Sequence, residues 1–330
     1  MLNTFLPWLA IGAGFLGLLW SANHFVEGSA AVAQNLGVPK LIIGLTIVAM
    51  GTSAPEVIVS ISSALNDAST LAVGNALGSN LANIGLVLGI TALIAPLPIK
   101  GHILKQEFPL MLALMLIAGG FLWDGNLTIV EGIILVALIV PVLLWFAYNK
   151  KQHPEEDDED IPAMATPKAL FWFLVGLVAM IISAEVLVYG AKIIALRLGI
   201  SPLVVGLTVV ALGTSLPELA ASISSALKGH HDIAIGNVIG SNIFNLLLVM
   251  GIPAIIEPIA LEASVFSRDY LAMTAITLLL GTAMVISYFK SSPPAQANVA
   301  SIKSSGISRL TGVLLLLAYM AYYVVLFIQN

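Results

Sequence analysis

The chain has 330 residues, of which 59% are hydrophobic and only 9% are charged, whereas ordinary soluble domains carry about 25% charged residues. This composition excludes a soluble globular enzyme. The net charge of −5 comes from six consecutive acids at residues 155–160, and the rest of the chain is close to neutral, which leaves no basic surface for nucleic acid. Cysteine is absent, so disulfides, thiolate metal sites and cysteine nucleophiles are excluded too.

Ten apolar stretches follow one another along the chain. A helix needs about 20 apolar residues to cross the hydrocarbon core of a bilayer. The stretches cover residues 5–33, 40–65, 70–95, 106–123, 127–149, 168–195, 202–226, 233–256, 269–289 and 309–328. The sequence therefore predicts an all-α membrane protein with ten transmembrane helices. The first helix is expected to be retained rather than cleaved, because no basic residue precedes it as in a signal peptide.

Lys and Arg are unequally divided between the two sets of connections. Ten of them flank the loops after the odd-numbered helices, and three lie on the other side. Cytoplasmic loops carry the excess of positive residues, so both termini are expected outside and the 150–167 connection in the cytoplasm. No organelle signal is found, and we expect a prokaryotic inner membrane protein.

One segment occurs twice at a fixed offset. LTIVAMGTSAPEVIVSISSAL (residues 45–65) and LTVVALGTSLPELAASISSAL (residues 207–227) are identical at 15 of 21 positions, and the same offset of 162 relates GNALGSNLAN (74–83) to GNVIGSNIFN (236–245). Each half then holds five spans, and an odd number inverts the second copy. We predict two inverted five-helix repeats, residues 1–149 and 168–330, an architecture that places transporter sites near the bilayer midplane.

The 150–167 segment is predicted to be a cytoplasmic acidic linker between the repeats. Its run of acids lacks the turn glycine and spaced ligands of a calcium-binding loop. A solvated linker is therefore the favoured interpretation.

Each repeated motif places an acid, Glu56 or Glu218, in the middle of a span that carries no other charge. An acid at a helix centre costs about 2.5–3.5 kcal/mol on insertion scales, so two of them require compensating positive charge. Neither motif contains Lys or Arg. The pattern predicts that both acids bind a cation, with protonation of one acid as the alternative.

A proline stands directly before each acid, at Pro55 and Pro217. Proline has no N–H for the carbonyl four residues earlier, that of Gly51 or Gly213, and it disfavours helical dihedrals in the preceding residue. We therefore expect each helix to break there. Irregular backbone at membrane depth is tolerated where it lines a cavity, and the break exposes oxygens beside each acid. The neighbouring hydroxyls belong to Thr52, Ser53, Thr214 and Ser215.

The second repeated segment adds neutral oxygen donors one turn apart on one helix face. These are Ser79 with Asn83, and Ser241 with Asn245. Calcium takes about 6 to 8 oxygen ligands, and sodium also binds oxygen donors, whereas zinc and copper prefer nitrogen or sulfur. A site that accommodates both Ca²⁺ and Na⁺ can exchange them.

GTSAPE (residues 51–56) and GTSLPE (213–218), each followed by GN-x-x-GSN, resemble the sodium/calcium exchanger branch of the cation/calcium antiporter superfamily. The resemblance spans the whole chain. It implies that the two Glu hold the transported ion, that backbone oxygens of Ala49 and Ala211 contribute, and that the Ser and Asn positions line sodium sites. It favours those carbonyls over the ones of Gly51 and Gly213, and both possibilities stay open. The predicted metal-binding residues are Glu56, Glu218, Thr52, Thr214, Ser53, Ser215, Ala49, Ala211, Ser79, Asn83, Ser241 and Asn245.

Two further acids, Glu27 and Glu185, lie in the first and sixth predicted helices. The repeat places Tyr189 and Asn23 at the equivalent positions, so symmetry gives them no support as ion ligands. Lys192, two turns after Glu185, is a candidate neutralising partner. We favour a structural role for both acids.

These features predict an antiporter that exchanges Na⁺ for Ca²⁺ by alternating access, with no cofactor, no obligate protein partner and only the two ions and the bilayer as partners. The resemblance implies three Na⁺ per Ca²⁺, which makes transport electrogenic. Potassium-dependent relatives carry Asp where this chain has the neutral Asn245, which argues against a potassium requirement and disfavours proton coupling.

The main alternative is a Ca²⁺/H⁺ antiporter in which one Glu is protonated. A cation channel is less favoured, because channels usually repeat around a pore by oligomerising. An intramembrane hydrolase is excluded by the lack of a paired nucleophile and base.

Overall fold

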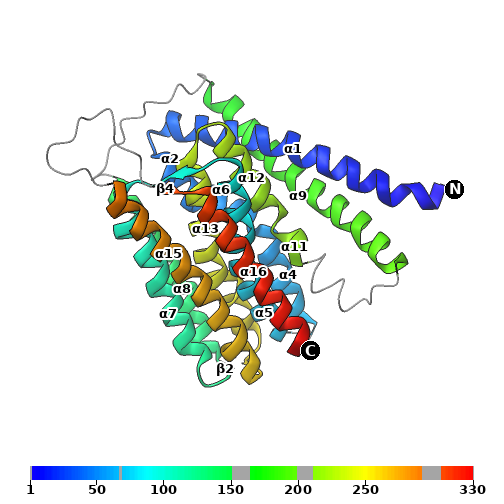
Figure 1. Cartoon of the computed structure of the whole chain (residues 1–330), viewed down its shortest axis with the longest axis vertical. Helices are drawn as coiled ribbons and strands as arrows, with labels where there is room; N and C mark the ends of the chain where they lie inside the picture. The colour runs from blue at the N-terminus through cyan, green and yellow to red at the C-terminus, as the bar shows by residue number, and fades with distance from the viewer. Residues whose placement is uncertain (1, 67–68, 151–163, 199–210, 292–305, 330) are drawn as a thin grey trace. The chain divides into compact units, whose positions relative to one another are not determined.

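The computed structural model describes residues 2–66, 69–150, 164–198, 211–291 and 306–329, and these are predominantly helical (Figure 1). Eight of the described helices are long and apolar enough to cross a membrane, and nine spans result if the bent pair Lys40–Thr52 and Ala54–Leu65 is one span. The chain is thus an all-helical membrane protein. The predicted helix at 202–226 is described only from residue 211, and most of the predicted linker at 150–167 lies outside the described residues.

The elements alternate long helices with short π-helical turns and two-residue strands. The first half contains α1 (Leu2–Leu36), α2 (Lys40–Ile43), η1 (Gly44–Val48), α3 (Ala49–Thr52), α4 (Ala54–Leu65), α5 (Ser69–Ala82), η2 (Asn83–Leu88), α6 (Gly89–Ile94), β1 (Leu97–Pro98), η3 (Ile103–Glu107), α7 (Phe108–Leu122), β2 (Asn126–Leu127) and α8 (Ile129–Lys150). The second half contains α9 (Thr166–Arg197), α11 (Ala211–Thr214), α12 (Leu216–Leu227), α13 (His231–Phe244), η5 (Asn245–Val249), α14 (Gly251–Ile256), β3 (Ile259–Ala260), η6 (Val265–Tyr270), α15 (Leu271–Ser291), β4 (Gly306–Ile307) and α16 (Arg309–Gln329).

The chain divides into two compact units, each of which takes residues from both halves. Unit 1 comprises Met1–Val59 and Val140–Ser241, and unit 2 comprises Ser60–Ile139 and Asn242–Asn330. The chain passes from one unit to the other within α4, α8 and α13.

Helices α1 and α9 run antiparallel along each other in unit 1 (Figure 1). A Cβ at Gly14 of α1 would lie 2.7 Å from the Cβ of Leu187, and one at Gly176 of α9 would lie 2.8 Å from the Cβ of Phe25. The two contacts are equivalent under the offset of 162, because Gly14 corresponds to Gly176 and Phe25 to Leu187. The helix pair therefore makes the same contact twice, in the manner of an isologous interface.

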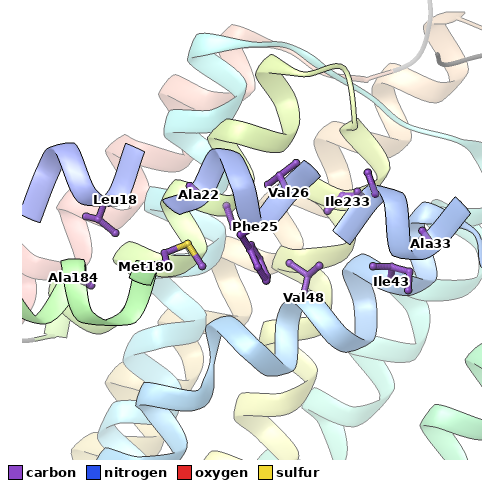
Figure 2. Close-up of a cluster of buried hydrophobic side chains, with 12 residues drawn as sticks. Leu18, Ala22, Phe25, Val26, Ala33, Ile43, Val48, Met180, Ala184 and Ile233 are labelled. Atoms are coloured by element: carbon purple, nitrogen blue, oxygen red, sulfur yellow. The ribbon is translucent and has the colours of Figure 1, made fainter. Parts of the chain in front are cut away.

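The core of unit 1 lies where these two helices meet α2, η1, α12 and α13. Figure 2 shows the side chains of α1 directed toward Met180 and Ala184 of α9 and toward Ile43 and Val48. Phe25 is fully buried at the centre of this cluster. Burial of a large apolar side chain is worth about 1.5–3 kcal/mol, so the cluster fixes α1 against the segment that leads into the first repeated motif.

Helix α13 approaches the same segment through glycines. A Cβ at Gly236 would lie 2.7 Å from the carbonyl oxygen of Leu41, and one at Gly240 would lie 2.5 Å from that of Leu45. Side chains at these positions would separate the backbones, as is common where membrane helices pack closely. The two glycines of the GN-x-x-GSN motif therefore allow α13 to pack closely against α2 and η1, the segment that leads to Thr52.

In unit 2, as in the α1–α9 pair, each contact between the first and the second half of the sequence occurs twice. Strand β1 pairs with β4 and β2 pairs with β3, both antiparallel. A Cβ at Gly312 would lie 2.7 Å from the carbonyl oxygen of Gly89, and a Cβ at Gly132 would lie 2.8 Å from that of Gly251. Helix α16 thus meets α6 as α8 meets α14.

Substitution of Gly132 by Ala tests these backbone contacts. The added Cβ would meet Gly251 O, Ala254 Cβ and Ile255 N within 3.0 Å, and overpacking of this kind costs about 1–3 kcal/mol. We expect Gly132→Ala to lower the thermal unfolding temperature of the purified protein. The control is Gly120→Ala, where nothing lies within 4 Å of an added Cβ. Equal unfolding temperatures for the two variants would contradict the packing described here.

Candidate cation site

In both repeated GTS-x-PE motifs the helix breaks at the serine that stands two residues before the proline. Helix α3 ends at Thr52, Ser53 has φ −84° and ψ 5°, and α4 starts at Ala54 with a bend of 44°. In the second half, Ser215 has φ −89° and ψ 3° between α11 and α12. A break near each proline is therefore present in both halves, but it lies at Ser53 and Ser215. Ala54 and Leu216, expected to leave the helical dihedrals, instead begin the next helices, because a proline in the first turn of a helix removes no intrahelical hydrogen bond.

The two acids that follow the breaks meet inside unit 1. Glu56 is 1% exposed and Glu218 is 0% exposed, and their charges interact. They do not belong to a group of three or more His, Asp or Glu side chains among the described residues. Two carboxylates placed together in a low-dielectric interior repel each other unless a cation or a proton compensates them.

Each acid lies near a hydroxyl-bearing residue from the opposite half of the chain. The Oγ of Ser53, in the first half, donates a hydrogen bond of 3.0 Å to Oε1 of Glu218, in the second half. Thr214, in the second half, lies near the carboxylate of Glu56 in the first. Glu218 thus accepts a hydrogen bond from the opposite motif, and Glu56 has a threonine of the opposite motif beside it.

The other predicted oxygen donors of unit 1 lie in the two broken turns, except Ser241, which belongs to helix α13. Thr52, Ser215 and Ser241 are buried, and the Oγ atoms of Ser215 and Ser241 have no hydrogen-bond partner within the described part of the chain. Ala49 is buried, and its carbonyl accepts the N–H of Ser53 at 2.9 Å. Ala211 is the first residue of α11. Buried hydroxyls normally find a partner, so two of these oxygens remain available to a ligand.

The remaining predicted residues belong to unit 2. Ser79, Asn83 and Asn245 are buried there, and neither amide atom of Asn83 or Asn245 has a hydrogen-bond partner among the described residues. Asn83 begins the π-helical turn η2 and Asn245 begins η5. Such π-helical insertions occur frequently at functional sites. The symmetric placement of the two turns follows the repeat.

The structure also contains two features that sequence reasoning missed. Asn237 of α13 makes side-chain hydrogen bonds with Thr52 and Ser222; its repetition as Asn75 was the available signal. Glu27 of α1 forms an ion pair of 2.6 Å with Lys228, the residue that caps α12. Glu185 instead lies exposed on α9.

A helical membrane protein that buries two carboxylates among hydroxyl and amide groups has the construction of a cation transporter. Intramembrane acids usually mark ion pathways, and oxygen is the donor that alkali and alkaline-earth cations prefer.

Comparison with known proteins agrees with this class. The family described as sodium/calcium exchanger protein matches residues 6–148 and 168–328. CaxA of Alkalimonas amylolytica is 42% identical over 321 residues, covering 95% of this chain and 96% of that protein. Inner membrane protein YrbG of Escherichia coli K12 is 37% identical, covering 81% and 85%. The solved structure of the sodium-calcium exchanger NCX_Mj has a TM-score of 0.81 at 30% identity and covers 97% of this chain and 99% of that one.

The chain belongs to the sodium/calcium exchanger family. It is a multi-pass membrane transporter of the cation/calcium antiporter class.

Ligand protection tests the carboxylate pair independently of transport. A ligand at 100 times its dissociation constant stabilises a protein by about 2.7 kcal/mol. We expect Ca²⁺ to raise the thermal unfolding temperature of the purified chain, and Glu218→Gln to abolish most of that rise because one of the two buried charges is lost. Glu262→Gln, which changes an exposed acid, should preserve it. Full protection of the Glu218 variant by Ca²⁺ would place the bound ion elsewhere.

Proposed function

We propose that the protein exchanges Na⁺ for Ca²⁺ across the membrane by alternating access. The observation that carries the proposal is the buried pair Glu56 and Glu218, in which Glu218 accepts a hydrogen bond from Ser53 of the opposite motif. Two carboxylates balance the charge of one Ca²⁺ or of two Na⁺. Because both ions use the same oxygens, binding of one displaces the other, which is the requirement for obligatory exchange.

The proposed ligands all offer oxygen. Two carboxylates with neighbouring hydroxyls and carbonyls approach the six to eight oxygens, at about 2.3–2.6 Å, that Ca²⁺ takes. The neutral amides and hydroxyls of the following helices would complete sodium sites without adding charge. The proposed set is Glu56, Glu218, Thr52, Thr214, Ser53, Ser215, Ala49, Ala211, Ser79, Asn83, Ser241 and Asn245.

The ten-helix inverted-repeat architecture is part of the proposal. The repeats would be residues 1–149 and 168–330, with 150–167 as a cytoplasmic linker. Reciprocal packing supports it, since Gly14 and Gly176 make equivalent contacts and the strand pairs exchange between the halves. Inverted repeats allow one set of ligands to face either side of the membrane in turn.

Three Na⁺ moving inward for each Ca²⁺ moving outward would carry one net positive charge inward. One charge is worth about 2.3 kcal/mol per 100 mV, so an inside-negative potential would favour Ca²⁺ export. The relative YrbG is named an inner membrane protein, which supports the same location here, with both termini proposed outside.

The Ca²⁺/H⁺ antiporter is the second candidate. It is favoured by one observation, namely that two carboxylates are buried close enough for their charges to repel each other, so that a proton on one of them would relieve the repulsion. In that case Ca²⁺ flux would follow the pH gradient and would not depend on Na⁺.

Calcium flux in reconstituted vesicles separates these candidates. With Na⁺ loaded inside, we expect rapid Ca²⁺ uptake that stops when Na⁺ is replaced by choline, and uptake driven by a pH gradient alone should be negligible. Glu56→Gln and Glu218→Gln should each reduce uptake at least tenfold, while Glu262→Gln should not. Uptake indifferent to Na⁺ would favour the proton antiporter, and normal uptake by either site variant would overturn the site assignment.

A valinomycin-imposed potential tests the stoichiometry. If one net charge moves with the Na⁺, making the vesicle interior positive should accelerate Na⁺ efflux and Ca²⁺ uptake, and making it negative should slow both. Identical initial rates at the two potentials would show electroneutral exchange.

A further inference from the structure

Asn237 connects the two GTS-x-PE motifs (residues 51–56 and 213–218) although it lies in neither of them. Its side chain is fully buried on α13, and its Oδ1 accepts a hydrogen bond of 3.0 Å from the hydroxyl of Thr52. Its Nδ2 donates to the backbone carbonyl of Glu218 at 3.3 Å and to Oγ of Ser222 at 3.0 Å. One amide therefore links the turn before the first break to the helix that carries the second acid.

The orientation of this amide is determined by its partners. A backbone carbonyl can only accept hydrogen bonds, so the NH₂ group of Asn237 must face the carbonyl of Glu218. The opposite end of the amide is then the oxygen, and it faces Thr52. Asn237 can thus act toward Thr52 only as an acceptor.

This orientation matters because a hydroxyl has one proton and two lone pairs. A hydroxyl oxygen ligates a cation through a lone pair, and its proton must then point elsewhere. The hydroxyl of Thr52 also lies 3.3 Å from the carbonyl oxygen of Ala49 and close to Glu218. Both oxygens therefore compete for the proton with Asn237, whose oxygen is the nearer acceptor at 3.0 Å. If the proton goes to Asn237, both the Thr52 oxygen and the carboxylate are free to face a cation.

We propose that Asn237 is a positioning residue of the cation site: by accepting the hydroxyl proton of Thr52, it makes the Thr52 oxygen a cation ligand. The inference rests on the proposed cation site and deepens it. Asn237 does not itself touch the ion.

The packing of α13 supports this role. Gly236 and Gly240 bring the helix backbone against the segment that leads to Thr52, which places the short Asn side chain within reach of the hydroxyl. At the equivalent position in unit 2, Asn75 donates to Oγ of Ser60 at 3.1 Å, as Asn237 donates to Ser222. The same amide-to-serine contact therefore occurs in both copies of the motif.

A double-mutant cycle on Ca²⁺ binding tests the inference. Binding of Ca²⁺ to the purified protein is measured by calorimetric titration for the unmodified chain, Thr52→Val, Asn237→Ala and the double variant. Loss of one hydrogen bond corresponds to about fivefold in affinity, and we expect each single variant to lose about that much. Because Asn237 acts through the Thr52 hydroxyl, the double variant should bind less than twofold more weakly than Thr52→Val.

A purely structural role predicts a different result. Asn237→Ala would then weaken binding by the same factor whether or not the Thr52 hydroxyl is present, and that additivity would overturn the inference. Ser222→Ala is the matched control, because it removes another partner of the same amide and leaves the bond to Thr52. We expect it to change affinity less than twofold.

If the Asn237→Ala protein is purified only in low yield, Asn237→Asp is measured in its place. It is nearly isosteric and keeps an oxygen acceptor for Thr52, so Thr52→Val should still cost about fivefold in its background. Absence of that cost would contradict the role of the acceptor. The measured quantity here is Ca²⁺ affinity, not transport. If flux proved to be driven by protons instead of sodium, the proposed Na⁺/Ca²⁺ exchange would be wrong, but the affinities would still decide the role of Asn237.

Discussion

The structure depends on the burial of two carboxylates within broken membrane helices. An isolated charge in such a place is unfavourable by several kcal/mol, and here two of the same sign are brought together. The prolines open the backbone beside the acids, and Ser53 of the first motif donates a hydrogen bond to Glu218 of the second. The remaining repulsion must be offset by a bound cation or by a proton on one acid, and a counter-charge that can leave is what a transporter requires.

The two copies of the motif contact each other in equivalent ways, and this explains how one sequence motif forms both sides of the site. Unit 1 receives both acids, and each motif places a hydroxyl-bearing residue near the acid of the other. The packing of α1 on α9 and the exchanged strand pairs in unit 2 follow the same rule. In the proposed exchange mechanism, ions bound between two copies of one motif would have nearly equivalent ligands, so the free energies of the two access states would differ little.

Much of this organisation was predictable from local sequence. Long apolar runs identify the spans, and Pro55 and Pro217 locate the breaks because proline removes a backbone donor wherever it stands. The fixed offset of the two motifs indicated that Glu56 and Glu218 play equivalent roles.

What could not be predicted depends on tertiary distance. The offset does not reveal that Ser53 reaches Glu218 rather than its own neighbour Glu56, because the choice is decided by how two broken turns face each other. Asn237 was read as one of several repeated polar residues, and its bond to Thr52 joins positions 185 residues apart. Likewise, Lys228 pairs with Glu27 across α1 and α12, a contact that spacing along a single helix cannot suggest.

The most direct test of the central claim is anomalous diffraction from crystals of the protein soaked in Ca²⁺. We predict a single strong anomalous peak between Glu56 and Glu218, with carboxylate oxygens of both residues at about 2.3–2.6 Å and further oxygens supplied by the two broken turns. A peak ligated by only one of these acids, or Ca²⁺ bound elsewhere while the two carboxylates stay in contact without it, would contradict the account.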